Sequence, residues 1–173
     1  MTTCKWLPEV LDYPDWNNYV EYENMLYSIF KIEIINATLL FREKRVEIRW
    51  YPIENNKEEA FYHCICKDYN NTKDRSPDPE RMIRIGWIAP IIRNYNCSDT
   101  CCDEKPLFWR KYVQKSKRYR YHLYFRRFLV VLEERGTYYL LITAFYVDKN
   151  QYDKSLRKDA QKAENAISND SVT

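Results

Sequence analysis

The chain contains very little glycine. Gly86 and Gly136 are the only two in 173 residues, where an average composition would supply about 12. Loops that cradle phosphate need closely spaced glycines, because the backbone must approach the anion. Neither glycine has a second one nearby. This scarcity excludes P-loop and Rossmann-type nucleotide binding, and it also excludes collagen-like and glycine-rich linker sequence.

Long hydrophobic runs are absent as well. No stretch approaches the ~18 apolar residues that cross a bilayer, and the first residues, M-T-T-C-K-W, lack the apolar segment of a signal peptide. We therefore expect a cytoplasmic protein without membrane contact, whose six cysteines are reduced thiols or metal ligands. Residues 1–167 are predicted to form one domain that begins with an irregular acidic arm at 1–18, and 168–173 a disordered tail.

Basic residues are concentrated in one segment. Nine lysines and arginines and no acidic residue occur between Lys105 and Arg127, interleaved with aromatic side chains. This mixture is typical of surfaces that bind phosphates and unstacked bases. The alternative is an ordinary solvated surface, since basic patches are common. Together with a basic last helix, the segment is predicted to contact RNA through Lys117, Arg118, Arg120, His122, Tyr124, Arg126, Lys154 and Arg157.

The first half of the chain mixes helices and strands. Apolar spacing and alternation predict a helix over 19–34, strands over 45–50 and 60–66 that pair as a hairpin, a polar loop over 67–77 and a helix over 79–92. Asn55 and Asn56 are predicted to form the hairpin turn. Asp78 caps the second helix and Pro79 begins it. Pro90 predicts a kink near Ala89.

The second half of the chain predicts an antiparallel sheet. Its strands are expected at 107–113, 117–125, 128–132 and 137–147, followed by an amphipathic helix over 152–167. Gly136 supplies the positive φ that a tight hairpin between the last two strands requires. The predicted fold class is therefore α+β, with a mainly antiparallel sheet of about four to six strands and helices packed on it.

Histidine and arginine are the candidate catalytic residues. Metal-independent RNA cleavage needs a general base, a general acid and cations that hold the phosphate, and histidine and arginine suit these roles. The only histidines are His63 and His122. His63 could equally be a core histidine, and His122 is expected at the surface. The adjacent acids Glu133 and Glu134 are predicted to be either solvated charges or strand-end charges.

A zinc site would use some of the same residues. Candidate ligands are His63, Cys64, Cys66, Cys97, Cys101 and Cys102. In a strand, however, His63 and Cys64 would point to opposite faces, so they could not converge without a bulge. A zinc-stabilised adaptor is therefore kept as an alternative function, and unligated thiols are the expectation.

Four segments carry a resemblance to known proteins. They are K-E-E-A-F-Y-H (57–63), P-D-P-E-R-M-I-R-I-G-W-I-A-P-I-I (77–92), L-F-W-R-K (107–111) and R-F-L-V-V-L-E-E-R-G-T-Y-Y-L-L-I-T-A-F-Y-V (127–147). Over about residues 45–160 the chain looks like a group of phage and prophage proteins, which in turn resemble the barnase/EndoU/colicin D/RelE-like (BECR) ribonuclease superfamily. The resemblance implies a BECR-like nuclease core in which the last hairpin forms the catalytic floor.

The same resemblance implies a function and its residues. The protein would be a metal-independent endoribonuclease without a cofactor, a toxin or phage-related effector whose products carry 2′,3′-cyclic phosphates. His63 would be the acid or base, Arg81 and Arg84 would bind phosphate, Thr143 would hydrogen-bond the scissile group, and Tyr146 would stack or orient. Its partners would be RNA, for example tRNA, and an antitoxin or immunity protein.

Ordinary structural roles remain open for these residues. Arg81 and Arg84 could simply pair with Asp78 or Glu80, and Thr143 could bond its own backbone. A non-catalytic RNA-binding or interaction protein that uses the basic aromatic segment is therefore the first alternative function.

Overall fold

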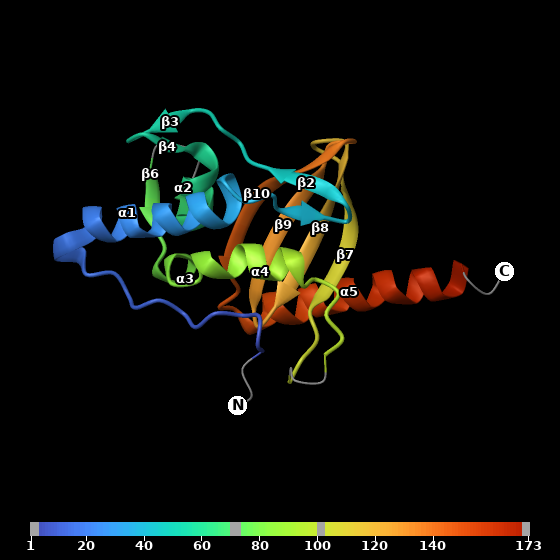
Figure 1. Cartoon of the computed structure of the whole chain (residues 1–173). Coiled ribbons are helices and arrows are strands. Elements are labelled where there is room, and N and C mark those ends of the chain that lie inside the picture. The colour runs from blue at the N-terminus through green and yellow to red at the C-terminus, as the bar shows by residue number, and fades with distance from the viewer. Residues whose placement is uncertain (1–3, 70–73, 100–102, 171–173) are drawn as a thin grey trace.

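The computed structural model describes residues 4–69, 74–99 and 103–170. They form an α+β fold built on a mixed six-stranded sheet (Figure 1), as the sequence predicted. The strand order is β1-β2-β10-β9-β8-β7. The strands are β1 (Leu40–Phe41), β2 (Lys44–Glu47), β7 (Leu107–Val113), β8 (Arg118–Phe125), β9 (Phe128–Glu134) and β10 (Tyr138–Tyr146).

Helices and two small hairpins surround this sheet. The hairpins are β3 (Ile53–Glu54) with β4 (Lys57–Glu58) and β5 (Cys66–Tyr69) with β6 (Asp74–Pro77). The helices are α1 (Tyr19–Phe30), which continues as a π-helical turn (Lys31–Ile35), α2 (Glu59–Ile65), α3 (Pro79–Met82), α4 (Ile88–Arg93) and α5 (Asn150–Asp170). Short 3₁₀ turns occupy Trp16–Asn18 and Ile85–Trp87.

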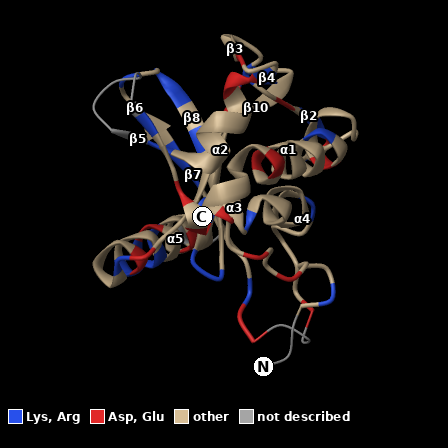
Figure 2. Ribbon diagram, turned by 90° about the vertical axis from the view of Figure 1, so that its left-hand side faces the viewer, with Lys and Arg blue, Asp and Glu red and all other residues tan. Residues whose placement is uncertain are grey.

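The sheet separates two apolar layers. On one face, α1, α2 and α4 bury the main core, and the other face packs against α5 (Figures 1 and 2). Strand β9 lies between them, so the run Phe128–Leu132 is buried on both faces, as expected for a central strand. The α5 layer includes Trp109, Tyr124, Leu156 and Ala160.

One edge of strand β10 pairs with another strand over only part of its length, and the candidate functional site lies beside the unpaired part. Its first residues, Tyr138–Leu140, pair in parallel with β2. Beyond them the β2 pairing ends, and α2 and α3 pack beside the second half of β10. A β-bulge between Leu141 and Thr143 re-aims the side chains that follow it. The sequence carried no signal for this parallel pairing.

Several local predictions are wrong in their details. Residues 60–66 form helix α2 and the start of β5 instead of a strand, because a short, fully buried apolar run fits either element. Residues 67–77, expected as a loop, form most of the β5–β6 hairpin around 70–73, which lie outside the described residues. The predicted strand over 45–50 ends at Glu47.

The helical predictions also need correction. Asp78 caps α3 and Pro79 begins it, as predicted, but the break falls at Ile83–Arg84 instead of near Ala89. Pro90 lies in the first turn of α4, where its missing N–H would have no partner anyway. Helix α5 runs on through 168–170, so the predicted tail can only be 171–173, which lie outside the described residues.

The cysteines are not all reduced. Cys4 is buried and disulfide-bonded, contrary to the expectation of reduced thiols, whereas Cys64, Cys66 and Cys97 form no disulfide. Burial raises the pKa of the Cys64 thiol to about 12, so this side chain is uncharged and unsuited to nucleophilic chemistry.

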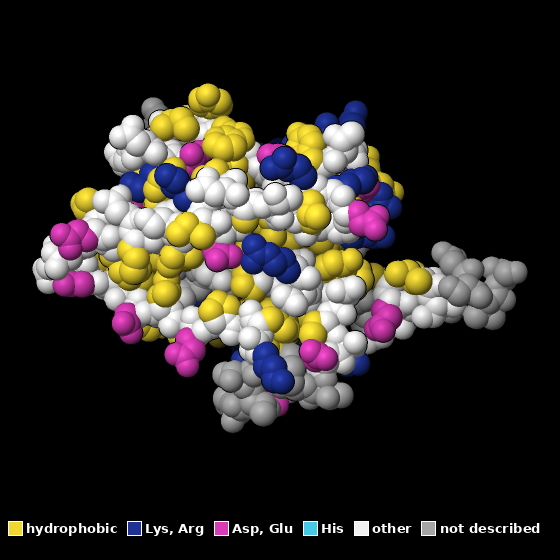
Figure 3. All heavy atoms as spheres, in the orientation of Figure 1, with side chains coloured by type: hydrophobic (Ala, Val, Ile, Leu, Met, Phe, Trp, Pro, Cys, Tyr) yellow, Lys and Arg dark blue, Asp and Glu magenta, His cyan; other side chains and the backbone are white. Residues whose placement is uncertain are grey.

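Apolar side chains are exposed mainly on the half of the molecule that contains α1 and the β3–β4 hairpin (Figure 3). They include Val20, Met25, Ile32, Trp50, Tyr51 and Ile53. No helix in the described part of the chain has the length and apolar character needed to cross a membrane.

Non-glycine residues make three of the tight turns in this glycine-poor chain. The turns are Arg42–Glu43, Asn55–Asn56 and Arg126–Arg127, and all six residues have positive φ. Asparagine tolerates this conformation, whereas the other side chains resist it. Gly136, at φ 76°, turns the β9–β10 hairpin as predicted.

Replacing Glu43 with glycine is therefore expected to raise the free energy of unfolding by about 1 kcal/mol, because glycine adopts φ 66° without the Cβ penalty. Urea unfolding measures the change. Glu43→Ala is the matched control, since it removes the same carboxylate but keeps the Cβ, and it should bring no such gain. An equal gain in both variants would contradict the turn argument.

Candidate functional site

Helix α2 places a histidine and a glutamate side by side. Glu59 and His63 are four residues apart, so they share one face of the helix. His63 Nε2 lies 3.0 Å from Glu59 Oε1. The guanidinium of Arg75, from β6, contacts the same carboxylate oxygen. The His63 side chain keeps 24% of its surface exposed while that of Glu59 keeps 9%, so part of the imidazole is accessible to solvent.

The end of α2 is bonded to α3 and β10 through the His63 backbone. The His63 carbonyl accepts hydrogen bonds from Arg81 Nη1 at 2.9 Å and from Thr143 Oγ1 at 3.1 Å. Arg81 Nη1 also lies 3.4 Å from Thr143 Oγ1. These bonds satisfy a carbonyl of the last helical turn, which has no partner within the helix. Three predicted catalytic residues, His63, Arg81 and Thr143, therefore meet at one place.

Arg81 is oriented by the cap of its own helix. The Asp78 carboxylate accepts from the backbone N–H of Glu80 at 3.0 Å and of Arg81 at 3.4 Å. Its other oxygen lies 3.4 Å from Arg81 Nε and 3.2 Å from Lys67 Nζ. The Arg81 guanidinium also lies 5.2 Å from the ring centre of Phe145. Two cations thus surround one buried carboxylate beside the histidine.

The other two predicted catalytic residues contact each other a little further along. The Arg84 guanidinium lies 4.1 Å from the ring centre of Tyr146 and donates to Glu80 Oε2 at 2.6 Å. Glu80 also accepts from the Tyr13 hydroxyl at 2.6 Å. These donors lower the pKa of the Glu80 carboxyl, although its partial burial opposes the shift. Arg84 Nη1 also donates to the Glu80 carbonyl at 3.1 Å, so its contacts join the α3 turn to the ring of Tyr146.

A cavity of about 380 Å³ opens beside these residues. It lies where β10 ends and α5 begins, against α3 and β5. Its lining combines three cationic, three acidic and three aromatic side chains, among them Lys67, Arg81, Phe145, Tyr146, Asp148 and Tyr152. Such a lining suits a ligand with both a flat ring and charged or polar groups.

The basic segment 105–127 does not form one surface. Residues directly opposite in a sheet share a face, and one row across β7, β8, β9 and β10 is Trp109, His122, Val131 and Thr143. Arg118 and Arg120 share this face, which also carries the site. Arg110, Tyr112 and Tyr119 lie on the opposite face, where the Arg110 guanidinium is 3.6 Å from the ring centre of Tyr119.

Two of the residues predicted to bind RNA lie under α5. Tyr124 is 1% exposed and its hydroxyl donates to Asp153 at 2.5 Å. His122 is half-buried and its ring stacks on Trp109, with centroids 5.1 Å apart. Tyr124 therefore presents no face to a polyanion, and His122 is only partly accessible. His122 lies less at the surface than predicted.

Burial lowers the pKa of His122 to about 4, with Lys111 and Arg120 adding to the shift. A lowered histidine pKa means that the unfolded chain binds a proton between about pH 6.5 and pH 4 while the folded chain does not. Folding stability is therefore expected to fall by about 1–2 kcal/mol between pH 7 and pH 5. Urea unfolding at both pH values measures this loss, and His122→Gln should remove most of it. A pH dependence unchanged in that variant would contradict the assignment.

A buried carboxylate gathers the arginines of this face. Glu133 is 1% exposed and lies at the end of β9, so it is a strand-end charge, as one of the two predicted alternatives had it, and not a solvated one. Its oxygens lie 2.9 Å from Arg120 Nε, 2.7 Å from Arg135 Nη2 and 3.9 Å from Arg118 Nε. Arg118 remains 46% exposed, and Figure 2 shows Lys and Arg positions in blue along the ribbon of β8. Three guanidinium groups around one carboxylate leave a net positive charge there.

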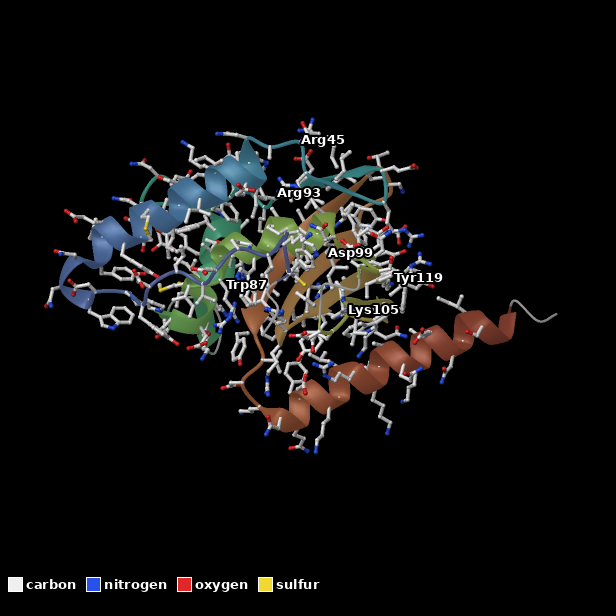
Figure 4. All side chains as sticks on the ribbon, turned by 60° about the horizontal axis from the view of Figure 1, so that its bottom comes forward. Arg45, Trp87, Arg93, Asp99, Lys105 and Tyr119 are labelled. Carbon is white, nitrogen blue, oxygen red and sulfur yellow. The ribbon has the colours of Figure 1, made fainter. Side chains whose placement is uncertain are left out.

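The remaining predicted RNA contacts lie toward the edges of the fold. Lys117 and Lys154 are exposed. Arg157 lies 3.0 Å from Asp153 and 3.5 Å from Glu104, and the Arg126 guanidinium lies 5.4 Å from the ring centre of Phe125. Lys105 and Tyr119, both in the basic segment 105–127, lie on the β7 side of the molecule, away from Trp87 (Figure 4).

The candidate zinc ligands do not converge. Within residues 4–69, 74–99 and 103–170, no three histidine, cysteine or acidic side chains are grouped to hold a metal ion. Cys64 and Cys66 are buried thiols that form no disulfide, and Cys101 and Cys102 lie outside the described residues. A zinc-stabilised adaptor therefore gains no support.

Sequence reasoning missed two residues of the site, Glu59 and Arg75, and did not foresee the burial of Glu133. The E-x-x-x-H spacing of Glu59 and His63 would have revealed their contact if the segment had been recognised as a helix. Arg75 comes from a hairpin that was expected to be a loop, and nothing in its local sequence marks it.

Comparison with protein-family models, curated proteins and solved structures found no match to this chain.

Proposed function

We propose that the protein is a metal-independent endoribonuclease whose site is built from Glu59, His63, Arg75 and Arg81. The observation that carries the proposal is the contact between the His63 imidazole and the Glu59 carboxylate, with Arg75 on the same carboxylate and Arg81 on the His63 carbonyl. A histidine paired with a carboxylate is suited to proton transfer near neutral pH, and guanidinium groups are suited to phosphate.

The geometry supports a division of roles. Glu59 would fix the imidazole ring and stabilise its protonated form, as the carboxylate of a catalytic triad does. His63 would take the proton from the 2′-hydroxyl, whose oxygen attacks the phosphorus as the bond to the 5′-oxygen breaks. Arg75 and Arg81, whose side chains are each 15% exposed, would hold the phosphate oxygens as their charge grows. The leaving 5′-oxygen would take a proton from water, so the products would be a 2′,3′-cyclic phosphate and a 5′-hydroxyl.

The test is cleavage of RNA by purified protein in EDTA, with the ends of the fragments identified. We expect cutting that resists EDTA, and fragments that carry 2′,3′-cyclic phosphates. RNA that stays intact over a range of sequences, salts and pH values would contradict the proposal. A toxin or phage-related effector role, with an antitoxin or immunity protein as partner, would follow only from such activity.

Non-catalytic RNA binding in a cytoplasmic setting is the second candidate. It is favoured by the structural contacts of Arg81 and Thr143, which hold the end of α2 to β10 whether or not any reaction occurs. The net positive charge around Glu133 would then supply the binding surface. Affinity for RNA that falls steeply with salt, without cleavage, would select this function.

A further inference from the structure

The loop between β10 and α5 is held in place by one arginine. The Arg127 guanidinium donates to the carbonyls of Val147 at 2.7 Å and Asp148 at 2.9 Å, and to Asn150 Oδ1 at 2.9 Å. The Val147 N–H donates in return to the Arg127 carbonyl at 2.7 Å. The backbone that carries Asp148 and Lys149 is thus fixed before any ligand arrives.

Asp148 differs from the other carboxylates of the cavity. Asp78 caps α3 and pairs with Lys67, and Glu80 pairs with Arg84 and Tyr13. The Asp148 carboxylate lines the cavity as well, yet it makes no hydrogen bond or ion pair to any described residue. Its oxygens are therefore available to accept hydrogen bonds from a ligand.

Aromatic rings form the wall next to this carboxylate. Phe145 and Tyr152 stack with their planes 8° apart and their centroids separated by 6.3 Å. Tyr152 remains 43% exposed, and both residues line the cavity. Arg81, which contacts the ring of Phe145, also bonds the His63 carbonyl. The aromatic wall and the proposed catalytic residues thus share one side chain.

We propose that this cavity binds a guanine base of the RNA, next to the phosphate that is cut. This inference rests on the proposed function. Exposed aromatic rings stack on bases of every kind, so the wall alone confers little selectivity. A carboxylate presents two acceptors, and guanine alone offers two adjacent N–H donors, on its Watson–Crick edge. Asp148 thus selects guanine over the other bases, and Lys149 lies where an adjacent phosphate can meet it.

The experiment measures binding with probes that cannot be cut. Fluorescent 2′-O-methyl oligouridylates with a single central guanine, adenine, cytosine or uracil are titrated with protein, and affinity is read from anisotropy. We expect the guanine probe to bind at least about fivefold more tightly than the uracil probe. Asp148→Asn should reduce that preference to less than about twofold. Glu54→Gln, which removes an exposed carboxylate outside the cavity, should keep it.

Equal affinity for the four probes, or a guanine preference that survives Asp148→Asn, would overturn the inference. The result of this binding experiment can be distinguished from the result of the RNA cleavage test. If unmodified RNA stays intact while the guanine preference depends on Asp148, catalysis fails and the base site stands. If RNA is cut at all four bases alike and the probes bind equally, the base site fails and catalysis stands.

Discussion

Replacing His63 with asparagine is expected to lower the rate of RNA cleavage at least about 100-fold, because a positioned general base contributes about that factor or more. The fold should survive this change. The bonds that hold α2 to α3 and β10 use the His63 backbone carbonyl, which every substitution at this position keeps. Side-chain chemistry and local structure can therefore be separated here. Cleavage of a labelled oligonucleotide is measured alongside circular dichroism and urea unfolding.

Two further variants make this test sharper. Glu59→Gln keeps the shape of the side chain but removes the charge that stabilises a protonated His63, so it should reduce cleavage by less than His63→Asn does. Thr143→Val removes a hydrogen bond to the His63 carbonyl and should cost about 1 kcal/mol of stability with a smaller effect on rate. An asparagine variant that folds and cuts RNA at the original rate would refute His63 as the base.

The sequence predicted the sheet better than the site. Strands β7 to β10 alternate or run apolar over seven to nine residues, and Gly136 marks their last turn, so local pattern and tertiary structure agree. Segment 60–66 is short and almost wholly buried. It therefore lacks the spacing of polar and apolar residues from which a helix could be distinguished from a strand. Because the segment was predicted to be a strand, Glu59 and His63 were not expected to lie side by side, and the principal contact of the site was not predicted.

Long-range contacts account for what else was missed. Arg75 reaches Glu59 from a hairpin, and Arg81 reaches Thr143 across 62 residues of sequence. The resemblance to BECR ribonucleases named His63, Arg81 and Thr143 without specifying any contact among them. In the structure it is the backbone of His63 that Arg81 and Thr143 bind, which no residue pattern encodes.

Glu133 is expected to be the most stabilising charged residue on the α5 face of the sheet. Replacing it with glutamine should lower the free energy of unfolding by about 3 kcal/mol, the lower end of the cost of breaking a buried ion pair. The three arginines would lose their shared carboxylate, while Arg120 and Arg135, each 29% exposed, could recover only part of their hydration. Arg120 is its direct cross-strand partner, so the loss also weakens β8–β9 pairing.

Glu134→Gln is the matched control for this prediction. The neighbouring carboxylate pairs with Arg110 at 2.9 Å, but the two side chains are 26% and 45% exposed, so water screens the pair. Its removal should cost less than about 1 kcal/mol. Urea unfolding of both variants at pH 7 gives the comparison. If Glu133→Gln and Glu134→Gln unfold at the same midpoint, burial does not govern the strength of these pairs, and the arginines around Glu133 are held by the strands alone.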